Sequence, residues 1–132
     1  MKGAYILIMD ANKDVELDIG KLGKILFNRG IYAYVGSAQN SLEKRLKRHF
    51  SKNKKLYWHI DYLLASPAIK ARKAFYKNAK KEEECKMAFL LASVGRPVKD
   101  FGCSDCDCYS HLFWIKSINS VLSRIGCLKE VI

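Results

Sequence analysis

The sequence lacks any hydrophobic run that is long enough to cross a membrane. Its first apolar run, Ala4 to Met9, is much shorter than the roughly 20 residues that a membrane-spanning helix requires. The same segment lacks the basic n-region and the small-residue cleavage site of a signal peptide. The sequence also has no isolated basic amphipathic helix of the kind that lies on membrane surfaces. We therefore expect a cytoplasmic protein that does not interact with membranes.

Internal repeats and low-complexity linkers are absent as well. At 132 residues with 49% hydrophobic side chains, the chain is long enough for one domain with a substantial core and too short for two. We therefore expect a single domain over residues 1–132. The sequence leaves the oligomeric state open.

Cysteines are few and odd in number. In a cytoplasmic protein, five cysteines are expected to be thiols or metal ligands rather than disulfides. Cys103, Cys106, Cys108 and His111 have the side-chain types that bind zinc. Structural zinc sites usually join two separated pairs of ligands, whereas these four residues fall within nine positions. We therefore expect this loop to be free of metal, with its thiols acting as small buried groups.

Acidic residues are scarce relative to basic ones, 13 against 24, which gives a formal net charge of +11. Many of the basic residues are concentrated in two segments, Lys44 to Lys55 and Lys70 to Lys81, and aromatic residues are interleaved with them. This pattern favours a nucleic acid as the partner. The candidate nucleic-acid-binding residues are Lys44, Lys47, Arg48, Lys52, Lys54 and Lys55.

Hydrophobic patterning predicts strands separated by helices. Strands are expected at Ala4 to Met9, Ile31 to Val35, Ala68 to Tyr76 and His111 to Ile115. The segment from Val15 to Leu26 is ambiguous, because its first residues alternate as in a strand and its later apolar residues would also fit a helical turn. Interleaved strands and helices indicate a mixed α/β (α+β) fold, with a small sheet flanked by helices.

Four helices are expected, three between these strands and one after the last of them. The first would start at Asn40, with Glu43 completing a capping box and with Leu42, Leu46 and Phe50 facing the core. The others are Trp58 to Leu64, Lys81 to Val94 and Ser117 to Ile125. In the Lys81 to Val94 helix, one side is expected to carry Cys85, Ala88, Phe89 and Ala92.

The segment Tyr34-Val35-Gly36-Ser37-Ala38, which precedes the first of these helices, is the most informative stretch of the chain. Arg45 and His49 follow it and are four residues apart, so they lie one helical turn above each other. A guanidinium offers a planar fork for phosphate oxygens, and an imidazole can donate or accept a proton near neutral pH. This arrangement suits a phosphodiester, whereas a purely solvated basic helix is the alternative.

The chain resembles the GIY-YIG nuclease family. Gly3-Ala4-Tyr5 is similar to the first family motif, Tyr34-Val35-Gly36 to the second, and Arg45 and His49 to the residues of the next helix. Glu84 matches the metal-binding glutamate, and the tail from Phe101 to Phe113 resembles a small stand-alone branch. Gly30-Ile31-Tyr32 spells the family name by coincidence, because it lies on the strand of Tyr34. The resemblance implies a small, mainly antiparallel sheet flanked by helices.

The resemblance also implies a metal-dependent endonuclease that hydrolyses DNA, single strands included. Tyr5 or Tyr34 would activate the attacking water, Arg45 would stabilise charge on the phosphate, and His49 would position a tyrosine or the leaving oxygen. A tyrosine acts as a base only where nearby cations lower its pKa, which normally lies near 10. Glu84 would hold one Mg²⁺ or Mn²⁺ ion, with Glu83 as its main competitor.

The chain departs from the family pattern in three ways. Residues 11–29 are inserted between the two tyrosine motifs, and Ser37 stands where some members carry a lysine. The late asparagine of some members has no clear counterpart. His59, which follows Trp58 in an apolar pattern, is expected to have a structural role. Two alternative functions remain, a nucleic-acid-binding module of the same fold without catalysis and a zinc-stabilised interaction domain.

Overall fold

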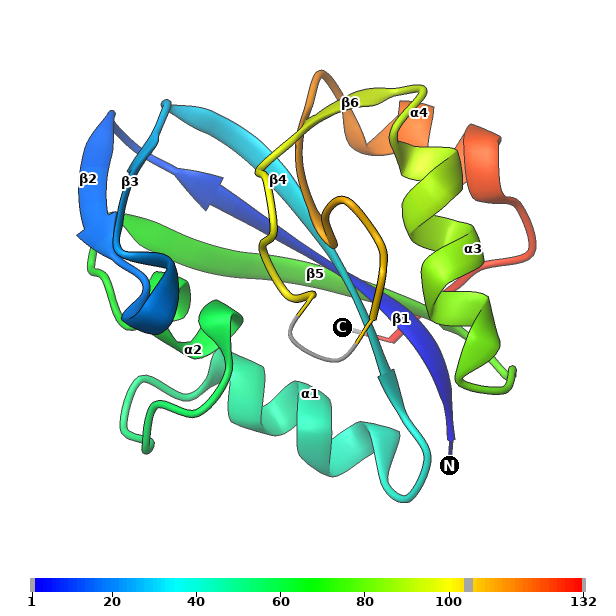
Figure 1. Ribbon diagram of the computed structural model, residues 1–132. Coiled ribbons are helices and arrows are strands. Elements are labelled where there is room, and N and C mark those ends of the chain that lie inside the picture. Colours follow the sequence, from blue (N-terminus) through cyan, green and yellow to red (C-terminus); the bar gives the residue numbers. More distant parts are fainter. Residues whose placement is uncertain (1, 104–105, 132) are drawn as a thin grey trace.

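A six-stranded antiparallel sheet forms the centre of the computed structural model, which describes residues 2–103 and 106–131. Its strand order is β6-β7-β4-β1-β5-β8, and Figure 1 shows helices on both faces. The strands are β1 (Gly3–Ala11), β4 (Gly30–Ala38), β5 (Ile69–Lys77), β6 (Gly95–Pro97), β7 (Leu112–Ile115) and β8 (Lys129–Glu130). The expected mixed α+β class, with a mainly antiparallel sheet, is confirmed.

The central strand β1 is buried on both faces, which explains its continuous apolar sequence. Tyr5, Leu7 and Met9 point into a core on one face, and Ala4, Ile6 and Ile8 point into a second core on the other. This alternation follows from the two-residue period of a strand. The sheet therefore separates two hydrophobic layers, and the first of them lies under the candidate site.

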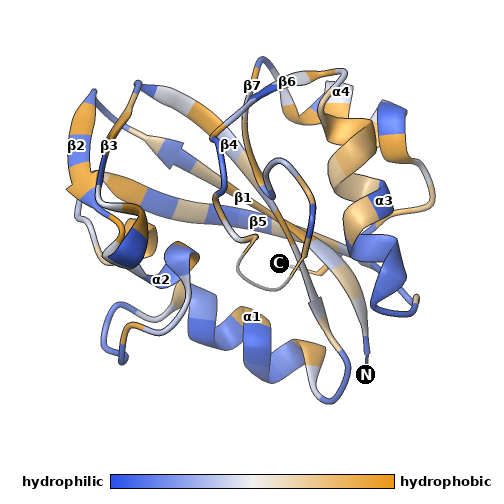
Figure 2. Ribbon diagram, viewed as in Figure 1, coloured by the Kyte–Doolittle hydropathy of each residue, from blue (hydrophilic) through white to orange (hydrophobic). Residues whose placement is uncertain are grey.

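The helices divide between these two layers. On the Tyr5 face lie α1 (Leu42–Phe50) and α2 (His59–Leu64), while α3 (Glu82–Leu91) and α4 (Ile118–Ile125) cover the other face. Figure 2 shows that α1 is hydrophilic over most of its ribbon, whereas α3 is hydrophilic only near its start and hydrophobic farther along. Helix α1 therefore contributes mainly its Leu42 and Leu46 side chains to the core.

The inserted residues 11–29 form a small unit of their own. They contain a two-stranded antiparallel sheet of β2 (Val15–Asp18) and β3 (Lys24–Phe27), joined through the short 3₁₀ helix η1 (Gly20–Leu22). Gly23 closes this turn with a φ of 76°, a conformation that favours glycine. Ile19 and Phe27 anchor the unit by packing into the core on the Tyr5 face. The ambiguous segment is therefore a hairpin.

Helix α1 begins one residue later than expected. Its N-cap is Ser41, whose side chain accepts a hydrogen bond from the backbone N–H of Lys44, and the predicted cap at Asn40 is wrong. Ser41 has extended φ and ψ angles directly before the first helical residue, which places its hydroxyl next to the unpaired N–H groups.

The predicted buried side of α3 is wrong in part. Phe89 is 78% exposed, and the residues of α3 that enter the core are Met87, Ala88 and Leu91. The sheet surface meets α3 along this row, so the Phe89 side chain projects away from it. The short strands β6 and β8 were not predicted, because three and two residues are too few to show a strand period. Within the described residues, no helix combines the length and apolarity needed to cross a membrane.

Candidate active site and metal centre

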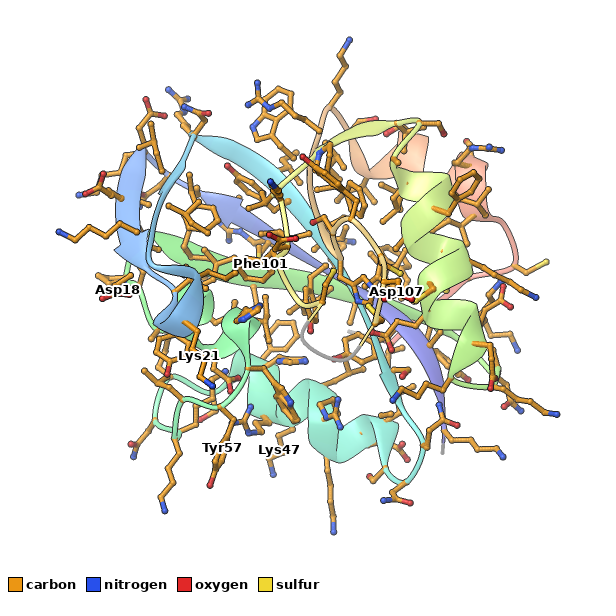
Figure 3. All side chains as sticks on the ribbon, viewed as in Figure 1. Asp18, Lys21, Lys47, Tyr57, Phe101 and Asp107 are labelled. Atoms are coloured by element: carbon orange, nitrogen blue, oxygen red, sulfur yellow. The ribbon has the colours of Figure 1, made fainter. Side chains whose placement is uncertain are left out.

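A cleft of about 520 Å³ opens between the insertion, the end of β4 and helices α1, α2 and α3. Three residues predicted from the sequence, Tyr34, Arg45 and Glu84, line it together. Its further lining residues are Gly20, Lys21, Gly36, Ser37, Tyr57, Trp58, His59, Tyr62, Lys81 and Gly102. Figure 3 shows Lys21 and Tyr57 on the same side of the molecule. Residues far apart in the sequence therefore meet at one polar cleft.

Tyr5 lies directly behind this cleft, against Gly36. The two residues are paired across β1 and β4, and a side chain at position 36 would collide with the Tyr5 hydroxyl. A glycine is therefore required at this point of the second motif. The tyrosine of the first motif and the glycine of the second depend on each other because they are paired on adjacent strands. Tyr5 is 1% exposed, and its hydroxyl lies 2.6 Å from Nε2 of His49.

Burial controls the protonation of this group. It raises the pKa of both Tyr5 and Tyr34 well above the ordinary tyrosine value, and the nearby Arg45 guanidinium offsets only part of that rise. Burial, together with Lys54, lowers the pKa of His49 to about 3. His49 is therefore neutral near pH 7. Arg45 does not lower the pKa of either tyrosine below its ordinary value, and Tyr34 is the one that lines the cleft.

Arg45 is held in place from two sides. Its Nη1 donates a hydrogen bond to the backbone oxygen of Ser37 at 3.0 Å, and its guanidinium carbon lies 4.3 Å from the ring centroid of Trp58. A guanidinium carries five N–H donors in one plane, so these contacts leave donors for a phosphate in the cleft. The side chain is therefore oriented before any ligand binds.

Glu84 occupies the opposite side of the cleft. Its Oε2 accepts a hydrogen bond from the Ser37 hydroxyl at 2.7 Å, and its Oε1 lies 2.9 Å from Nδ1 of His111. Glu83 instead forms an ion pair of 2.7 Å with Lys77. Of the two neighbouring glutamates, Glu84 therefore lines the cleft and Glu83 does not. Ser37 joins both sides, because its carbonyl contacts Arg45 and its hydroxyl contacts Glu84.

Half of the predicted nucleic-acid-binding residues make internal contacts. Arg48 forms a two-pronged ion pair with the buried Asp61, with distances of 2.6 and 2.9 Å. Lys52 donates to the backbone oxygens of Leu64, Ser66 and Ile69, and Lys54 donates to those of Arg48 and His49. The remaining three, Lys44, Lys47 and Lys55, are exposed. Arg48, Lys52 and Lys54, which the sequence pattern assigned to nucleic-acid binding, therefore bind protein groups within the fold.

The cleft contains aromatic and histidine residues that sequence analysis did not assign to it. Tyr57 and Trp58 are 71% and 41% exposed at its edge. His59 lines the cleft, and its Nδ1 accepts a hydrogen bond from the backbone N–H of Gly102 at 2.8 Å. Burial lowers the pKa of His59, so the neutral ring carries its proton on Nε2. The aromatic pair before a histidine was the available signal in the sequence.

A second group of side chains lies beside Glu84 and has the composition of a metal-binding cluster. It consists of Cys85 of α3 and of Cys106, Cys108 and His111 from the loop before β7, and their ligand atoms all lie within 4.8 Å of one another. This ligand set is more typical of zinc than of magnesium. The group expected from the sequence contained Cys103 instead of Cys85. In the structure, the Cys103 thiol donates to the backbone oxygen of Phe101.

The expectation of a metal-free loop considered only residues within nine positions of one another. The fold adds a possible ligand from a separate helix, Cys85, to two cysteines and the histidine of that loop. Cys85 was not recognised because the helix pattern placed it among apolar residues, with no local link to the loop. Ser104 and Asp105, which belong to the same loop motif, lie outside the described residues.

Comparison with known protein families matches residues 4–131 to the family described as Domain of unknown function DUF123. The match covers nearly the whole chain, and the protein belongs to this family. No curated protein and no solved structure matched the chain.

Proposed function

We propose that this DUF123 member is a metal-dependent endonuclease of the GIY-YIG type that hydrolyses phosphodiester bonds of DNA. The observation that carries the proposal is the convergence of Tyr34, Arg45 and Glu84, from β4, α1 and α3, on one cleft. A carboxylate, an arginine and a hydroxyl around one cavity are the groups that phosphodiester hydrolysis requires.

Glu84 fits the role of a ligand for a single Mg²⁺ or Mn²⁺ ion. Mg²⁺ is commonly bound through one or two carboxylates and keeps several of its waters. Each carboxylate oxygen of Glu84 has one protein neighbour, Ser37 or His111, and a carboxylate oxygen can accept more than one contact. A bound divalent ion would supply a polarised water and would neutralise phosphate charge.

The residues of the chain supply the remaining chemistry. Water attacks the phosphorus, and the bond to the leaving oxygen breaks, while Arg45 stabilises the added negative charge on the phosphate. Tyr34 faces the cleft and orients the water through its hydroxyl. Tyr5 and His49 lie behind it as a hydrogen-bonded pair, which makes them positioning residues for this wall of the cleft rather than groups that contact the substrate.

DNA would reach the cleft along the edge that carries Tyr57, which is 71% exposed, whereas the Trp58 ring is already contacted by Arg45 and Arg48. Exposed aromatic rings stack on bases and favour single-stranded segments. Lys44, Lys47 and Lys55 are exposed on α1 and the following loop, where they would contact phosphates. The substrate is therefore proposed to be DNA with unpaired bases near the cleaved bond.

A non-catalytic nucleic-acid-binding module is the second candidate. One observation favours it: burial raises the pKa of both tyrosines, so near neutral pH each stays a neutral phenol rather than the phenolate that could take a proton from water. In that case the same cleft would bind a phosphate without cleaving the strand.

Cleavage of labelled single-stranded, duplex and branched DNA, with and without Mg²⁺, separates the two candidates. Arg45→Ala should reduce cleavage by about 10²–10³-fold, because it removes an aimed cation from the transition state. Arg72→Ala is the matched control, because Arg72 pairs with the partly exposed Asp10 on β1 and does not line the cleft. Near-normal cleavage by a folded Arg45→Ala variant would rule out this role.

The two glutamates provide a second matched pair. Glu84→Gln should lose cleavage and its response to Mg²⁺ but keep DNA binding, whereas Glu83→Gln should cleave normally. Loss of activity in Glu83→Gln alone would show that the metal ligand is the neighbouring residue. DNA binding without cleavage of any substrate by the wild-type protein in Mg²⁺ would favour the binding module.

A further inference from the structure

We propose that Cys85, Cys106, Cys108 and His111 bind one structural zinc ion, and that this ion orients Glu84 through the His111 ring. The four ligand atoms come from a helix and a loop that are otherwise separate, and they lie within 4.8 Å of one another. Zinc binding stands independently of the proposed nuclease activity, whereas the consequence for Glu84 as a metal ligand rests on it.

The spacing of the ligand atoms fits a tetrahedral site after a small adjustment. Zinc–sulfur bonds of about 2.3 Å and zinc–nitrogen bonds of about 2.0–2.1 Å place neighbouring ligand atoms roughly 3.5–3.8 Å apart. His111 Nε2 lies 3.5 Å from Cys106 Sγ and 3.9 Å from Cys85 Sγ. The Sγ atoms of Cys85 and Cys108 are 2.6 Å apart, so they must separate by about 1 Å to bind the same ion.

The His111 ring supplies a second, independent observation. The residue is 1% exposed, and its Nδ1 is buried without a hydrogen bond of good geometry among the described residues. Glu84 Oε1 nevertheless lies 2.9 Å from that atom. Zinc on Nε2 would place the ring proton on Nδ1, so Nδ1 would become a donor that faces a carboxylate. Metal-bound histidines commonly donate to a carboxylate in this way.

An ion can reach the cluster from solvent. A cavity of about 210 Å³ opens at this point, and Glu84, Cys85, Cys106 and His111 are among its lining residues. Binding of Zn²⁺ would displace the protons of the three thiols and leave three thiolates and a neutral imidazole around the ion. The zinc would also tie α3 to the loop before β7, which lacks a strand or helix between Val98 and His111 in its described part.

The proposed zinc site and the proposed divalent-ion site at Glu84 would therefore lie next to each other, joined by the His111 ring. The cysteine cluster would hold a closed zinc site, and Glu84 would present its other lone pairs to a divalent ion in the cleft. Ser37 fixes Oε2 of the same carboxylate, so a zinc-bound His111 would complete its orientation. Loss of zinc is then expected to disturb the cleft without touching Arg45 or Tyr34 directly.

The metal content of the full-length protein, purified under reducing conditions with zinc supplied, tests the site. We expect one zinc per chain in the wild type and loss of zinc in Cys85→Ser and Cys108→Ser. Cys127→Ser is the matched control outside the cluster and should retain one zinc. Cys103→Ser, whose thiol lies beside Cys106 but is not among the four ligands, should also retain it. Replacement by Co²⁺ should give the visible absorption of a tetrahedral thiolate site, which remains informative if a cysteine variant fails to fold.

Two results would overturn the zinc site. One is zinc-free wild-type protein that is folded and gives no cobalt–thiolate absorption. The other is a disulfide between Cys85 and Cys108 in the reduced preparation, detected after unfolding with a chelator as two fewer reactive thiols than the five in the sequence. Retention of stoichiometric zinc by Cys85→Ser with loss in Cys103→Ser would show that the ligand set is wrong.

The link to Glu84 has a readout other than cleavage. Glu84→Gln should weaken zinc retention in competition with a chelator by about 10–100-fold, the usual effect of losing a carboxylate behind a metal-bound histidine. Glu83→Gln should leave zinc retention unchanged. Equal zinc affinity in both variants would refute the link, while absence of nuclease activity in a zinc-loaded protein would refute only the proposed function.

Discussion

The two sides of the cleft are built in different ways. We call the side formed by Tyr5, Arg45, Arg48, His49 and Asp61 the α1 wall, and the side formed by Glu84, His111 and the three cysteines of the cluster the α3 wall. In the α1 wall, Arg45, Arg48 and Asp61 are bonded to protein atoms, and the Tyr5 hydroxyl contacts His49. In the α3 wall, thiols and an imidazole converge on one point. Among the described residues, each wall also holds a buried ring nitrogen without a good hydrogen bond, Nδ1 of His49 in one and Nδ1 of His111 in the other.

This difference indicates what each wall requires in order to keep its shape. A carboxylate that is fully buried is stable only where it is paired and hydrogen-bonded, and Asp61 meets this condition through Arg48 and the N–H groups of Tyr57 and Trp58. The charged groups of the α1 wall are therefore paired once the chain has folded. The α3 wall would be complete only with an ion at its cluster, so it should respond to chelators while the α1 wall should not.

The largest effect is expected where the internal charge pairing of the α1 wall is broken. Arg48→Met should lower the free energy of unfolding by about 3 kcal/mol near neutral pH, because it removes the two-pronged partner of the buried Asp61 carboxylate and leaves only Lys54, at 4.0 Å, beside it. Chemical denaturation of the variant and the wild type in the same buffer measures this difference.

Arg72→Met is the matched control for that measurement. Arg72 and Asp10 form an ion pair of 2.8 Å, but their side chains are 50% and 33% exposed, and exposed pairs contribute about 0–1 kcal/mol. Equal destabilisation by both substitutions would contradict the distinction between a buried and an exposed pair. Solvation of Asp61 by penetrating water would produce that outcome.

The pH dependence of stability tests the buried histidine of the α1 wall. Burial lowers the pKa of His49 to about 3 from 6.5, so the unfolded chain takes up a proton first as the pH falls. The contribution of neutral His49 to the free energy of unfolding is therefore fully present above pH 6.5, and it is lost as the pH falls from about 6.5 to 3. These two pKa values predict a loss of about 2 kcal/mol between pH 7 and pH 5.

His49→Gln keeps a polar atom near the Tyr5 hydroxyl but cannot titrate in this range. Its stability should change less between pH 7 and pH 5 than that of the wild type. Some pH dependence should remain, because burial also lowers the pKa of His59. An unchanged slope in His49→Gln, measured by denaturation at each pH, would show that His49 is not the group responsible.

The local parts of both walls could be predicted from the sequence. Strands β1 and β4, helix α1 and the presence of Arg45 and Glu84 in one site followed from period, spacing and motif. Each of these features depends either on residues within one segment or on the order of motifs along the chain. Gly36 was also recognisable as part of the second motif, but the reason for a glycine there required the strand register. Gly36 lies within β4 opposite Tyr5, and a side chain would collide with the Tyr5 hydroxyl.

The contacts between distant segments could not be predicted. Cys85 and Cys108 are 23 residues apart, and the Arg48–Asp61 pair joins a helix to the start of the next helix. No local pattern reports such pairings, because a thiol among apolar residues resembles a core residue and a basic side chain on a helix resembles a surface residue. Internal charge pairing and metal-ligand sets therefore need the three-dimensional structure.

Ser37 provides a smaller test, because it joins the two walls. Ser37→Ala removes the hydroxyl that donates to Glu84 but keeps the carbonyl that accepts from Arg45. The lost hydrogen bond stabilises the orientation of Glu84 by about 1 kcal/mol. We therefore expect cleavage to require a several-fold higher Mg²⁺ concentration. Ser41→Ala, which removes the cap of α1, should instead reduce stability and leave this dependence unchanged. The reverse assignment of the two effects would contradict the proposed role of Ser37.

The smallest effect concerns the charges on the outer side of the α1 wall. Lys47 is exposed on α1 (Figure 3), whereas Lys52 donates to three backbone oxygens. If Lys44, Lys47 and Lys55 contact phosphates, the logarithm of DNA affinity should fall with the logarithm of salt concentration with a slope of about −2 on single strands or −3 on duplex DNA. Lys47→Gln should reduce the magnitude of that slope by about 0.7–0.9, as measured by binding titrations at several salt concentrations. Lys52→Gln should lower stability instead and leave the slope unchanged, since its charge is used within the fold. If Lys52→Gln changes the slope as much as Lys47→Gln does, then Lys52 leaves its carbonyl partners to bind DNA, and the α1 wall is less fixed than its internal contacts indicate.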